Sequence, residues 1–291
     1  MPELPEVEHT RRNLERWWKG ARIAAVHARD PRIVRPLSAR SFALRLRGAE
    51  VERVERRGKW IRVALDRDRL LFVHLGMTGW FEPSARSAEP LRFERVAFDL
   101  DRTRAPTRVS FVDARRWGQI SLAREDSATW AALGPDPLSD GIELAALHAR
   151  LQRSKNRTIK EALLDQTVLA GVGNIQAIEA LWKAQIDPRS PARALRVDDV
   201  RALVRALHWT IERTLRDLAK GDHGARNPFR IYGRKGKACP RCGADLSRIE
   251  LAGRTTTFCN GCQRALTVNS ERATARPAVS RARPKRARAR G

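Results

Sequence analysis

Four cysteines within 24 residues place the strongest constraint on what this chain can fold into. They form two C-x-x-C pairs, Cys239 with Cys242 and Cys259 with Cys262, and 16 residues separate the pairs. This spacing is typical of a zinc site with four thiolate ligands, each pair lying in a tight turn. Two disulfides or a redox dithiol are the alternatives, and an intracellular setting disfavours the disulfides. We therefore predict one structural Zn²⁺ in a small ribbon, with the RTTTFC segment as one of its strands.

Basic residues dominate the charge of the chain. It carries 58 Lys and Arg against 33 Asp and Glu, a net charge of +25. The segment 273–291 holds 7 basic residues and no acid, so its removal lowers the charge only from +25 to +18. Because the rest of the chain is itself basic, a polyanion such as nucleic acid is the favoured partner. No apolar run approaches the roughly 20 residues that cross a bilayer, and the N-terminus has no signal-peptide core, so we expect an intracellular protein without a membrane partner.

The first 130 residues predict one helix followed by strands. Segment 3–20 carries apolar residues at helical spacing and ends at Gly20. Alternating apolar and polar residues, with turn residues between them, then indicate strands. The expected strands are 22–28, 50–58, 59–66, 69–76, 95–101, 108–113 and 118–123. This pattern predicts an antiparallel β-sandwich that ends near Trp130.

The second half of the chain changes to helical periodicity. The Pro-, Gly- and Asp-rich segment 132–141 has the composition of a linker. The expected helices are 142–152, 158–165, 174–185 and 197–220. The predicted fold class is therefore α+β: an N-terminal β-sandwich with an N-terminal helix, a helical domain and a C-terminal zinc-ribbon hairpin. The predicted boundaries are 1–131, 132–236 and 237–265, followed by a basic disordered tail, 266–291.

A glycine-rich turn, AGVGN, lies between two of these helices. Backbone N–H groups of Gly171, Gly173 and Asn174, at the start of a helix, could hold a phosphate. An ordinary corner between helices, with Asn174 as N-cap, explains the same residues. The turn alone leaves both interpretations open.

The first eight residues, MPELPEVE, raise a separate question. Pro5 suits a first helical turn, and Glu6 and Glu8 suit the positive end of a helix dipole. Neither argument explains Pro2. Removal of Met1 would make Pro2 the N-terminus and expose a secondary amine.

Eight short motifs in order resemble one family. They are PELPEVE, RRGKWI, HLGMTG, DARRWG, LGPDPL, LLDQTVLAGVGNI, IYGRKGKACPRCG and RTTTFCNGCQ. Together they are similar to the bacterial formamidopyrimidine-DNA glycosylases, a family that includes the endonuclease VIII enzymes. The resemblance covers residues 2 to 264. It implies a helix–two-turns–helix domain and a monomer that acts on damaged double-stranded DNA in the bacterial cytoplasm, associated with the nucleoid.

The resemblance also implies roles for four residues near the N-terminus and in the RRGKWI hairpin. Pro2 matches the family's nucleophile, and an α-amine with a pKa of roughly 7.7 to 8.0 is partly neutral near physiological pH. Glu3 matches the general acid/base, Glu6 a supporting residue, and Lys59 the essential hairpin lysine. The alternatives are that both glutamates only complement the helix dipole and that Lys59 is a solvated surface charge.

Two loops match those that fill the gap left when a base leaves the duplex. HLGMTG and DARRWG point to Met77, Arg115 and Trp117 as the inserted residues, since apolar wedges replace stacking and Arg can pair with the orphaned base. A core position for Met77 and Trp117 is the alternative, although flanking glycines favour exposed turns. The residues that match phosphate-binding positions are His74, Lys160, Asn174 and Arg254.

Several departures from the family pattern concern lesion preference. Trp117 stands where phenylalanine is usual, Ala114 where proline is usual, and Gln176 where an aromatic residue is common. The segment 220–234 is shorter than the loop that covers a flipped 8-oxoguanine in the purine-specific enzymes. PELPEVE favours the formamidopyrimidine branch, whereas the short loop favours oxidised pyrimidines.

The predicted function is a bifunctional DNA glycosylase and abasic-site lyase of base excision repair. It would remove oxidised bases such as formamidopyrimidine and 8-oxoguanine through a Schiff base on Pro2 and then cleave the strand by β,δ-elimination. One alternative is an endonuclease VIII-like preference for oxidised pyrimidines. A second is a zinc-ribbon DNA-binding protein without enzymatic activity.

Overall fold

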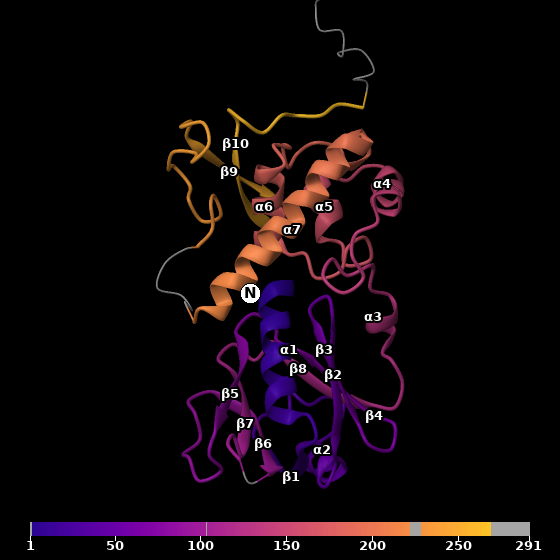
Figure 1. The fold of residues 1–291 in the computed structure, drawn as a ribbon, viewed down its shortest axis with the longest axis vertical. Coiled ribbons are helices and arrows are strands. Elements are labelled where there is room, and N and C mark those ends of the chain that lie inside the picture. The colour runs from indigo at the N-terminus through magenta and orange to yellow at the C-terminus, as the bar shows by residue number, and fades with distance from the viewer. Residues whose placement is uncertain (1, 103, 222–227, 269–291) are drawn as a thin grey trace, which may run out of the picture.

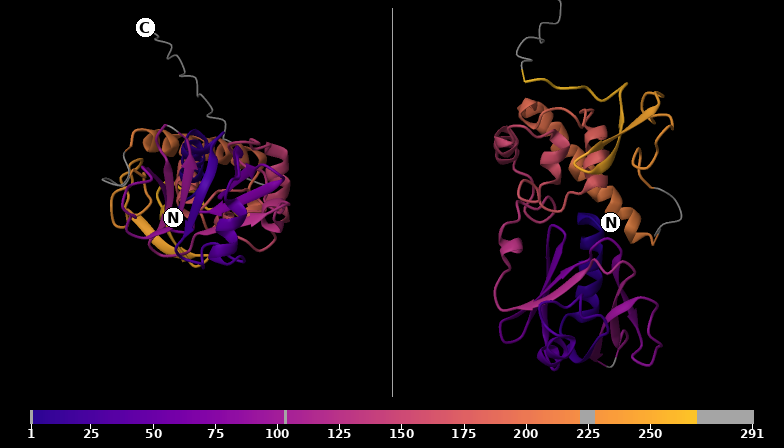
Figure 2. Two further views of the ribbon diagram at one scale, coloured as in Figure 1. Left: turned by 90° about the horizontal axis from the view of Figure 1, so that it is seen from below. Right: turned by 180° about the vertical axis from the view of Figure 1, so that it is seen from behind.

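Two domains lie end to end, and the first helix begins at their junction (Figures 1 and 2). The computed structural model describes residues 2–102, 104–221 and 228–268. Most of the predicted tail, from residue 269 onward, therefore lies outside the described residues. The architecture combines antiparallel sheets with a separate group of helices, which confirms the α+β prediction.

The N-terminal domain is a sandwich of two antiparallel four-stranded sheets. The first has the order β1 (Arg22–Ala28), β6 (Glu94–Asp101), β7 (Arg108–Asp113) and β5 (Gly79–Ser84). The second has the order β2 (Val51–Arg57), β3 (Trp60–Leu65), β4 (Arg69–His74) and β8 (Gln119–Ala123). The sequence analysis missed β5, which contains Pro83. Because β5 is an edge strand, one side of its backbone needs no ladder partner and proline is tolerated there.

Helix α1 (Leu4–Trp18) packs its apolar side into this sandwich. Glu3 is the N-cap and forms a capping box with Glu6, which explains why the helix begins at Leu4. Near its other end, the Trp18 ring meets Phe98 edge-on, with centroids 4.9 Å apart, and is completely buried. Two short helices, α2 (Ala39–Leu46) and α3 (Ala128–Ala131), were not predicted.

The second domain is helical, as predicted. Its elements are α4 (Leu144–Arg153), α5 (Ile159–Leu164), α6 (Asn174–Lys183), the 3₁₀ helix η1 (Ala192–Ala194) and α7 (Val197–Ala219). Their apolar sides form a second core, distinct from that of the sandwich. Helix α7 also packs against α1, so the two domains share a helix–helix contact at their junction.

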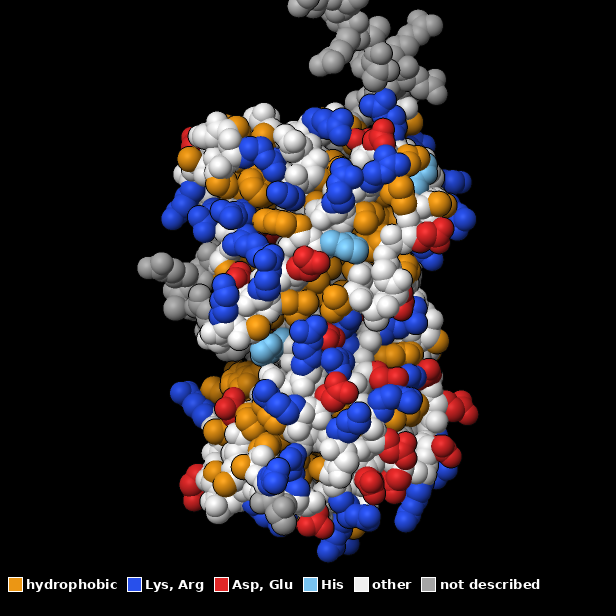
Figure 3. All heavy atoms as spheres, viewed as in Figure 1, with side chains coloured by type: hydrophobic (Ala, Val, Ile, Leu, Met, Phe, Trp, Pro, Cys, Tyr) orange, Lys and Arg blue, Asp and Glu red, His pale blue; other side chains and the backbone are white. Residues whose placement is uncertain are grey.

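A two-stranded hairpin, β9 (Leu246–Leu251) and β10 (Arg254–Cys259), completes the described chain. Strand β10 lies beside α6. On the face shown in Figure 3, Lys and Arg side chains gather over the helical domain and the hairpin and continue to the junction. Across the described ranges, no helix combines the length and apolar character needed to span a membrane.

Candidate active site and DNA-binding surface

Glu3 lies where α1 meets the N-terminus of α6. The backbone N–H groups of Ile175 and Gln176 donate hydrogen bonds to its two carboxylate oxygens, at 2.8 and 2.9 Å. The side chain is almost fully buried. Burial raises the pKa of Glu3, while the nearby Lys59 ammonium and the two N–H donors act in the opposite direction. The result is a carboxyl group whose position is fixed by the backbone of the other domain.

The glycine-rich turn permits this close approach. A Cβ atom at Gly173 would lie 2.3 Å from Glu3 Cδ, and one at Gly171, where φ is +86°, would lie 2.8 Å from Leu4 Cβ. The N-cap of α6 is Gly173 and Asn174 is the first helical residue, so the alternative in which Asn174 caps this helix is wrong. The free N–H groups at this helix start are used by a carboxylate of the same chain.

Lys59 lies in the two-residue turn between β2 and β3, and this turn packs against Gly171 of the glycine-rich turn. Gly58, with φ at +58°, would place a Cβ 3.1 Å from the Gly171 nitrogen. Lys59 is half-buried. Burial lowers the pKa of Lys59, Arg254 lowers it further, and Glu3 and Glu6 raise it. Lys59 is therefore a partly desolvated amine beside two carboxyl groups, which differs from a solvated surface charge.

Glu6 completes the capping box and is itself electrostatically coupled to Glu3. Its Oε2 accepts a hydrogen bond from the Glu3 N–H at 2.9 Å. Burial, and then the neighbouring Glu3 carboxylate, raise the pKa of Glu6 to about 7. The negative charge of Glu3 therefore disfavours ionisation of Glu6, and the Glu6 carboxyl is partly protonated near neutral pH.

A buried ion network that the sequence analysis missed holds the turn that contains Lys59. Arg56 and Asp136 form a bidentate pair, and Arg56 Nε also donates to Glu8 Oε2 at 3.0 Å. The Gly58 N–H donates to Asp136 Oδ2 at 2.7 Å. Asp136 belongs to the LGPDPL segment between the domains, so this linker residue holds the hairpin that carries Lys59.

The two predicted void-filling loops lie side by side. A Cβ at Gly76, in the first loop, would lie 2.5 Å from the Gly118 nitrogen in the second. Trp117 is 59% exposed, which excludes a core position, and the Arg115 guanidinium lies 4.5 Å from its ring centroid. Met77 is half-buried.

Asp113 ties these loops together and was also missed. Its carboxylate accepts hydrogen bonds from Thr78 Oγ1 at 2.5 Å, from the Arg115 N–H at 3.1 Å and from the Gly118 N–H at 2.8 Å. The residue is fully buried at the end of β7. The signal that could have revealed it is an aspartate directly after an apolar strand, at the first position of DARRWG.

The residues predicted to bind phosphates differ in burial and in their contacts. The centroid of the His74 ring lies 4.8 Å from that of Trp60, with the two ring planes tilted by 49°. Burial, and then the Lys59 charge, lower the pKa of His74. Asn174 Nδ2 donates to the Thr255 carbonyl at 3.0 Å, which joins α6 to β10. Arg254, at the start of β10, is exposed.

Lys160 does not have the surface position that direct phosphate contact requires. Its side chain is fully buried, and Nζ donates to Thr256 Oγ1 at 2.5 Å. Burial, and then the Arg254 charge, lower the pKa of Lys160 to about 8. Thr256 Oγ1 in turn donates to the Arg254 carbonyl at 3.1 Å. Lys160 therefore supports the strand that presents Arg254.

Gln176 and Glu179, both on α6, make further buried contacts. Gln176 Oε1 accepts from Thr210 Oγ1 at 2.9 Å, which links α6 to α7. The Glu179 carboxylate accepts three backbone N–H groups, each at 2.9 Å, from residues 230–232. Most of the short loop after Lys220, residues 222–227, lies outside the described residues.

The four cysteine sulfurs cluster as a tetrahedral metal site requires. All lie within 4.8 Å of one another; Cys239 Sγ is 3.8 Å from Cys262 Sγ, and Cys242 Sγ is 3.4 Å from Cys259 Sγ. Thiolates about 2.3 Å from a central Zn²⁺ lie about 3.8 Å apart, whereas a disulfide requires about 2.05 Å. The donor set and its spacing fit one structural zinc and exclude the predicted alternative of two disulfides.

Three domain models match most of the chain, and together with the fold they define a DNA-repair glycosylase with a zinc finger. The formamidopyrimidine-DNA glycosylase N-terminal domain matches residues 1–120, and its H2TH domain matches 133–223. The zinc finger found in FPG and IleRS matches 236–265. The chain belongs to the formamidopyrimidine-DNA glycosylase family.

Relatives and solved structures agree with this assignment. Formamidopyrimidine-DNA glycosylases of Laribacter hongkongensis and Sphingopyxis alaskensis are 39% and 40% identical, each over 91% of this chain and 100% of the relative. The Lactococcus lactis enzyme, non-covalently bound to DNA with an abasic site, has a TM-score of 0.80 at 29% identity, covering 90% of this chain and 99% of that one. MutM in complex with DNA containing carbocyclic 8-oxo-G has a TM-score of 0.81 at 29% identity, covering 90% and 100%.

Proposed function

We propose that this glycosylase acts through Pro2, forms a Schiff base with the damaged nucleotide, and then cleaves the strand as a lyase. In the chain from which Met1 has been removed, Pro2 carries a secondary amine next to Glu3. The observation that supports this best is the grouping of Glu3, Glu6 and Lys59 beside the N-terminus, with raised carboxyl pKa values and a lowered Lys59 pKa.

The proposed reaction follows from the chemistry of a secondary amine. The Pro2 nitrogen bonds to C1′ of the deoxyribose and loses its proton, while the base leaves with the electrons of its bond to C1′ and takes up a proton. The nitrogen lone pair then breaks the C1′–O4′ bond, O4′ takes up a proton, and the opened sugar carries an iminium. The iminium withdraws electrons, so the C2′ proton can be removed and the 3′ phosphate leaves by β-elimination; a further elimination releases the 5′ phosphate. Water then hydrolyses the remaining iminium and regenerates the amine.

Each buried group has a role in this sequence. Glu3 would transfer protons at the opened sugar, and Glu6 would hold the first turn of α1. Lys59 would assist proton transfer and bind a phosphate beside His74, Asn174 and Arg254. Met77, Arg115 and Trp117 would occupy the gap in the duplex, and the partner would be damaged double-stranded DNA bound by a single chain in the cytoplasm.

Borohydride trapping tests the proposal directly, because only an imine is reduced to a permanent protein–DNA adduct. Duplexes with 8-oxoguanine, formamidopyrimidine, 5-hydroxyuracil, thymine glycol or an abasic site should each give an adduct, and the rates would rank the lesions. Fast trapping with both oxidised pyrimidines and slow trapping with 8-oxoguanine would favour the endonuclease VIII-like preference. Tight DNA binding without any adduct would overturn the enzymatic proposal and favour a binding protein.

A further inference from the structure

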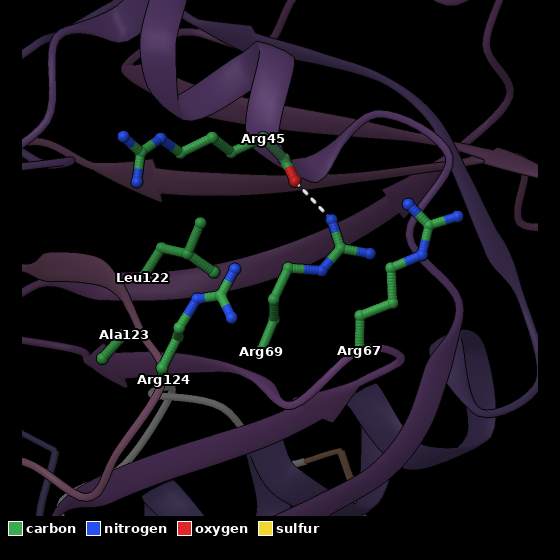
Figure 4. Close-up of a pocket in the computed structure, with 6 residues that line it drawn as sticks. All are labelled: Arg45, Arg67, Arg69, Leu122, Ala123 and Arg124. Atoms are coloured by element: carbon green, nitrogen blue, oxygen red, sulfur yellow. Dashed lines mark hydrogen bonds between the residues drawn. The ribbon is translucent and has the colours of Figure 1, made fainter.

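A concentration of arginines surrounds a hollow at the far end of the sandwich. Four arginines and the side chains of Leu122 and Ala123 line this arginine pocket, which has a volume of about 570 Å³ (Figure 4). The arginines are Arg45 on α2, Arg67 in the turn between β3 and β4, Arg69 at the start of β4, and Arg124 just after β8. None of them belongs to the site around Glu3.

Hydrogen bonds and ion pairs order two of the four arginines that line the pocket. Arg69 is paired with Asp66, and its Nη1 donates to the Arg45 carbonyl at 2.5 Å (Figure 4). Arg67 lies 3.8 Å from the same Asp66 carboxylate and is 85% exposed. The Asp66 carboxylate is therefore the counter-ion of two of the four arginines, Arg67 and Arg69.

The guanidinium groups of the other two arginines, Arg45 and Arg124, are free to bind an anion. Within residues 2–102, 104–221 and 228–268, the side chains of Arg45 and Arg124 have no hydrogen-bond or ion-pair partner. Like charges that share a concave surface repel one another, and an anion bound between them removes that repulsion. Guanidinium forks match the oxygens of a phosphate in bidentate geometry, and Leu122 supplies an apolar contact for a sugar.

The position of the pocket separates it from the active site. Trp60 pairs with His74 at the junction end of β4, whereas Leu65 pairs with Arg69 at the other end. At ~3.4 Å per residue, these two ends of β4 are about 17 Å apart. Helix α2, which carries Arg45, lies at the end of the sandwich farthest from the helical domain (Figure 1). The arginine pocket and the site around Glu3 therefore lie at opposite ends of the sandwich.

We propose that the arginine pocket binds the sugar-phosphate backbone of a second DNA segment while the active site is occupied. DNA is favoured over an acidic protein because this family binds DNA in its solved complexes and because the pocket combines phosphate-matching forks with one small apolar surface. Such a site lets the enzyme hold undamaged DNA and pass between segments. The inference is independent of the chemistry at Pro2.

The test uses the full zinc-loaded chain saturated with an unlabelled short duplex that contains a tetrahydrofuran abasic analogue. A fluorescent undamaged duplex is then titrated, and its anisotropy is measured over a range of salt concentrations. We compare the wild type with Arg45→Gln/Arg124→Gln. The matched control is Arg40→Gln/Arg53→Gln, which removes two charges from exposed arginines of the same domain that do not line the pocket.

The pocket variant should bind the second duplex about tenfold more weakly, and its slope of log K against log salt should fall by about 1.8, because each lost phosphate contact contributes about 0.9. Arg67→Gln should show a smaller loss of the same kind, while the control and the excision rate on a single short duplex should match the wild type. Equal binding by both double variants would overturn the proposal. So would failure of the wild type to bind a second duplex, or pocket-dependent binding of a labelled polyglutamate peptide but not of DNA.

Discussion

The Gln176 N–H donates a hydrogen bond to Glu3 Oε2 at 2.9 Å. This bond joins the N-cap residue of α1, in the sandwich domain, to the first turn of α6, in the helical domain. A carboxylate at the positive end of a helix is stabilised by the dipole and by the unpaired N–H groups there. The same contact fixes the orientation of Glu3. Glu3 is thus held in this orientation only when the two domains are docked.

Glu3→Gln should abolish most base excision while leaving the fold intact. The amide retains one oxygen that accepts from Ile175 or Gln176, but it cannot exchange a proton with the sugar, and general acid–base groups contribute about 10²–10⁴-fold. Single-turnover excision from a lesion-containing duplex should fall by at least the lower of these factors. Glu82→Gln, on the edge strand β5, serves as the control and should excise at the wild-type rate. A Glu3→Gln rate within a few-fold of the wild type would contradict the proposed role.

Glu6 should make stability depend on pH between about 4.5 and 7. Its pKa is raised from 4.5 to about 7 by burial and by Glu3, so the folded state keeps a proton that the unfolded chain has already lost. The protonated Glu6 carboxyl therefore contributes its full share to the free energy of unfolding below pH 4.5, and this share is lost as pH rises through 7. At pH 8 the folded state carries a penalty of up to roughly 3 kcal/mol, from 1.36 kcal/mol per pKa unit.

Glu6→Gln should remove that penalty. Urea unfolding should give similar stabilities for the variant and the wild type at pH 4.5 and a more stable variant at pH 8. The exposed Glu52→Gln change is the control, for which we expect the same small difference at both pH values. A constant offset between Glu6→Gln and the wild type across this range would contradict the linkage.

Trp117→Ala should slow base excision more than cleavage at a preformed abasic site. The indole is exposed beside Arg115, where it can replace stacking lost when a base leaves the duplex, and an abasic sugar needs less unstacking. We expect about a tenfold loss on a lesion-containing duplex, since one aromatic stacking contact contributes about 1–3 kcal/mol. Trp80→Ala, which removes another surface tryptophan, 44% exposed, is the control. Equal losses on both substrates would instead indicate a general folding defect.

Local patterns in the sequence predicted more of this structure than long-range pairings did. Alternation predicted seven of the sandwich strands, and the C-x-x-C spacing predicted the zinc ligands, because both signals lie within a few residues. Asp113 and Thr78 are 35 residues apart, and Asp136 and Gly58 are 78 apart, so nothing in either segment marks its partner. Lys160 shows the limit of motif transfer, since its position matched a phosphate contact but tertiary packing buried the side chain.

Asp136→Asn should destabilise the protein and disturb the Lys59 hairpin together. The change leaves the Arg56 guanidinium buried with only Glu8 as a charged partner, and breaking a buried pair costs about 3–5 kcal/mol. Urea unfolding should show this loss, and borohydride trapping at a saturating abasic site should slow. Asp140→Asn removes a partly exposed carboxylate from the same segment and should cost less than about 1 kcal/mol. Similar effects of the two substitutions would show that the buried network does not hold the hairpin.

Removal of zinc should weaken DNA binding through Arg254. Cys259 is the last residue of β10, and Arg254 is the first, so loss of a metal ligand releases the strand that presents this exposed guanidinium. Cys259→Ser should lose the single bound zinc, measured by metal analysis, and should bind an abasic-analogue duplex at least tenfold more weakly. Arg254→Gln separates the two effects, because it should weaken binding while keeping one zinc per chain. A Cys259→Ser protein that retains full affinity after losing zinc would show that the hairpin is positioned by α6 and Lys160 alone.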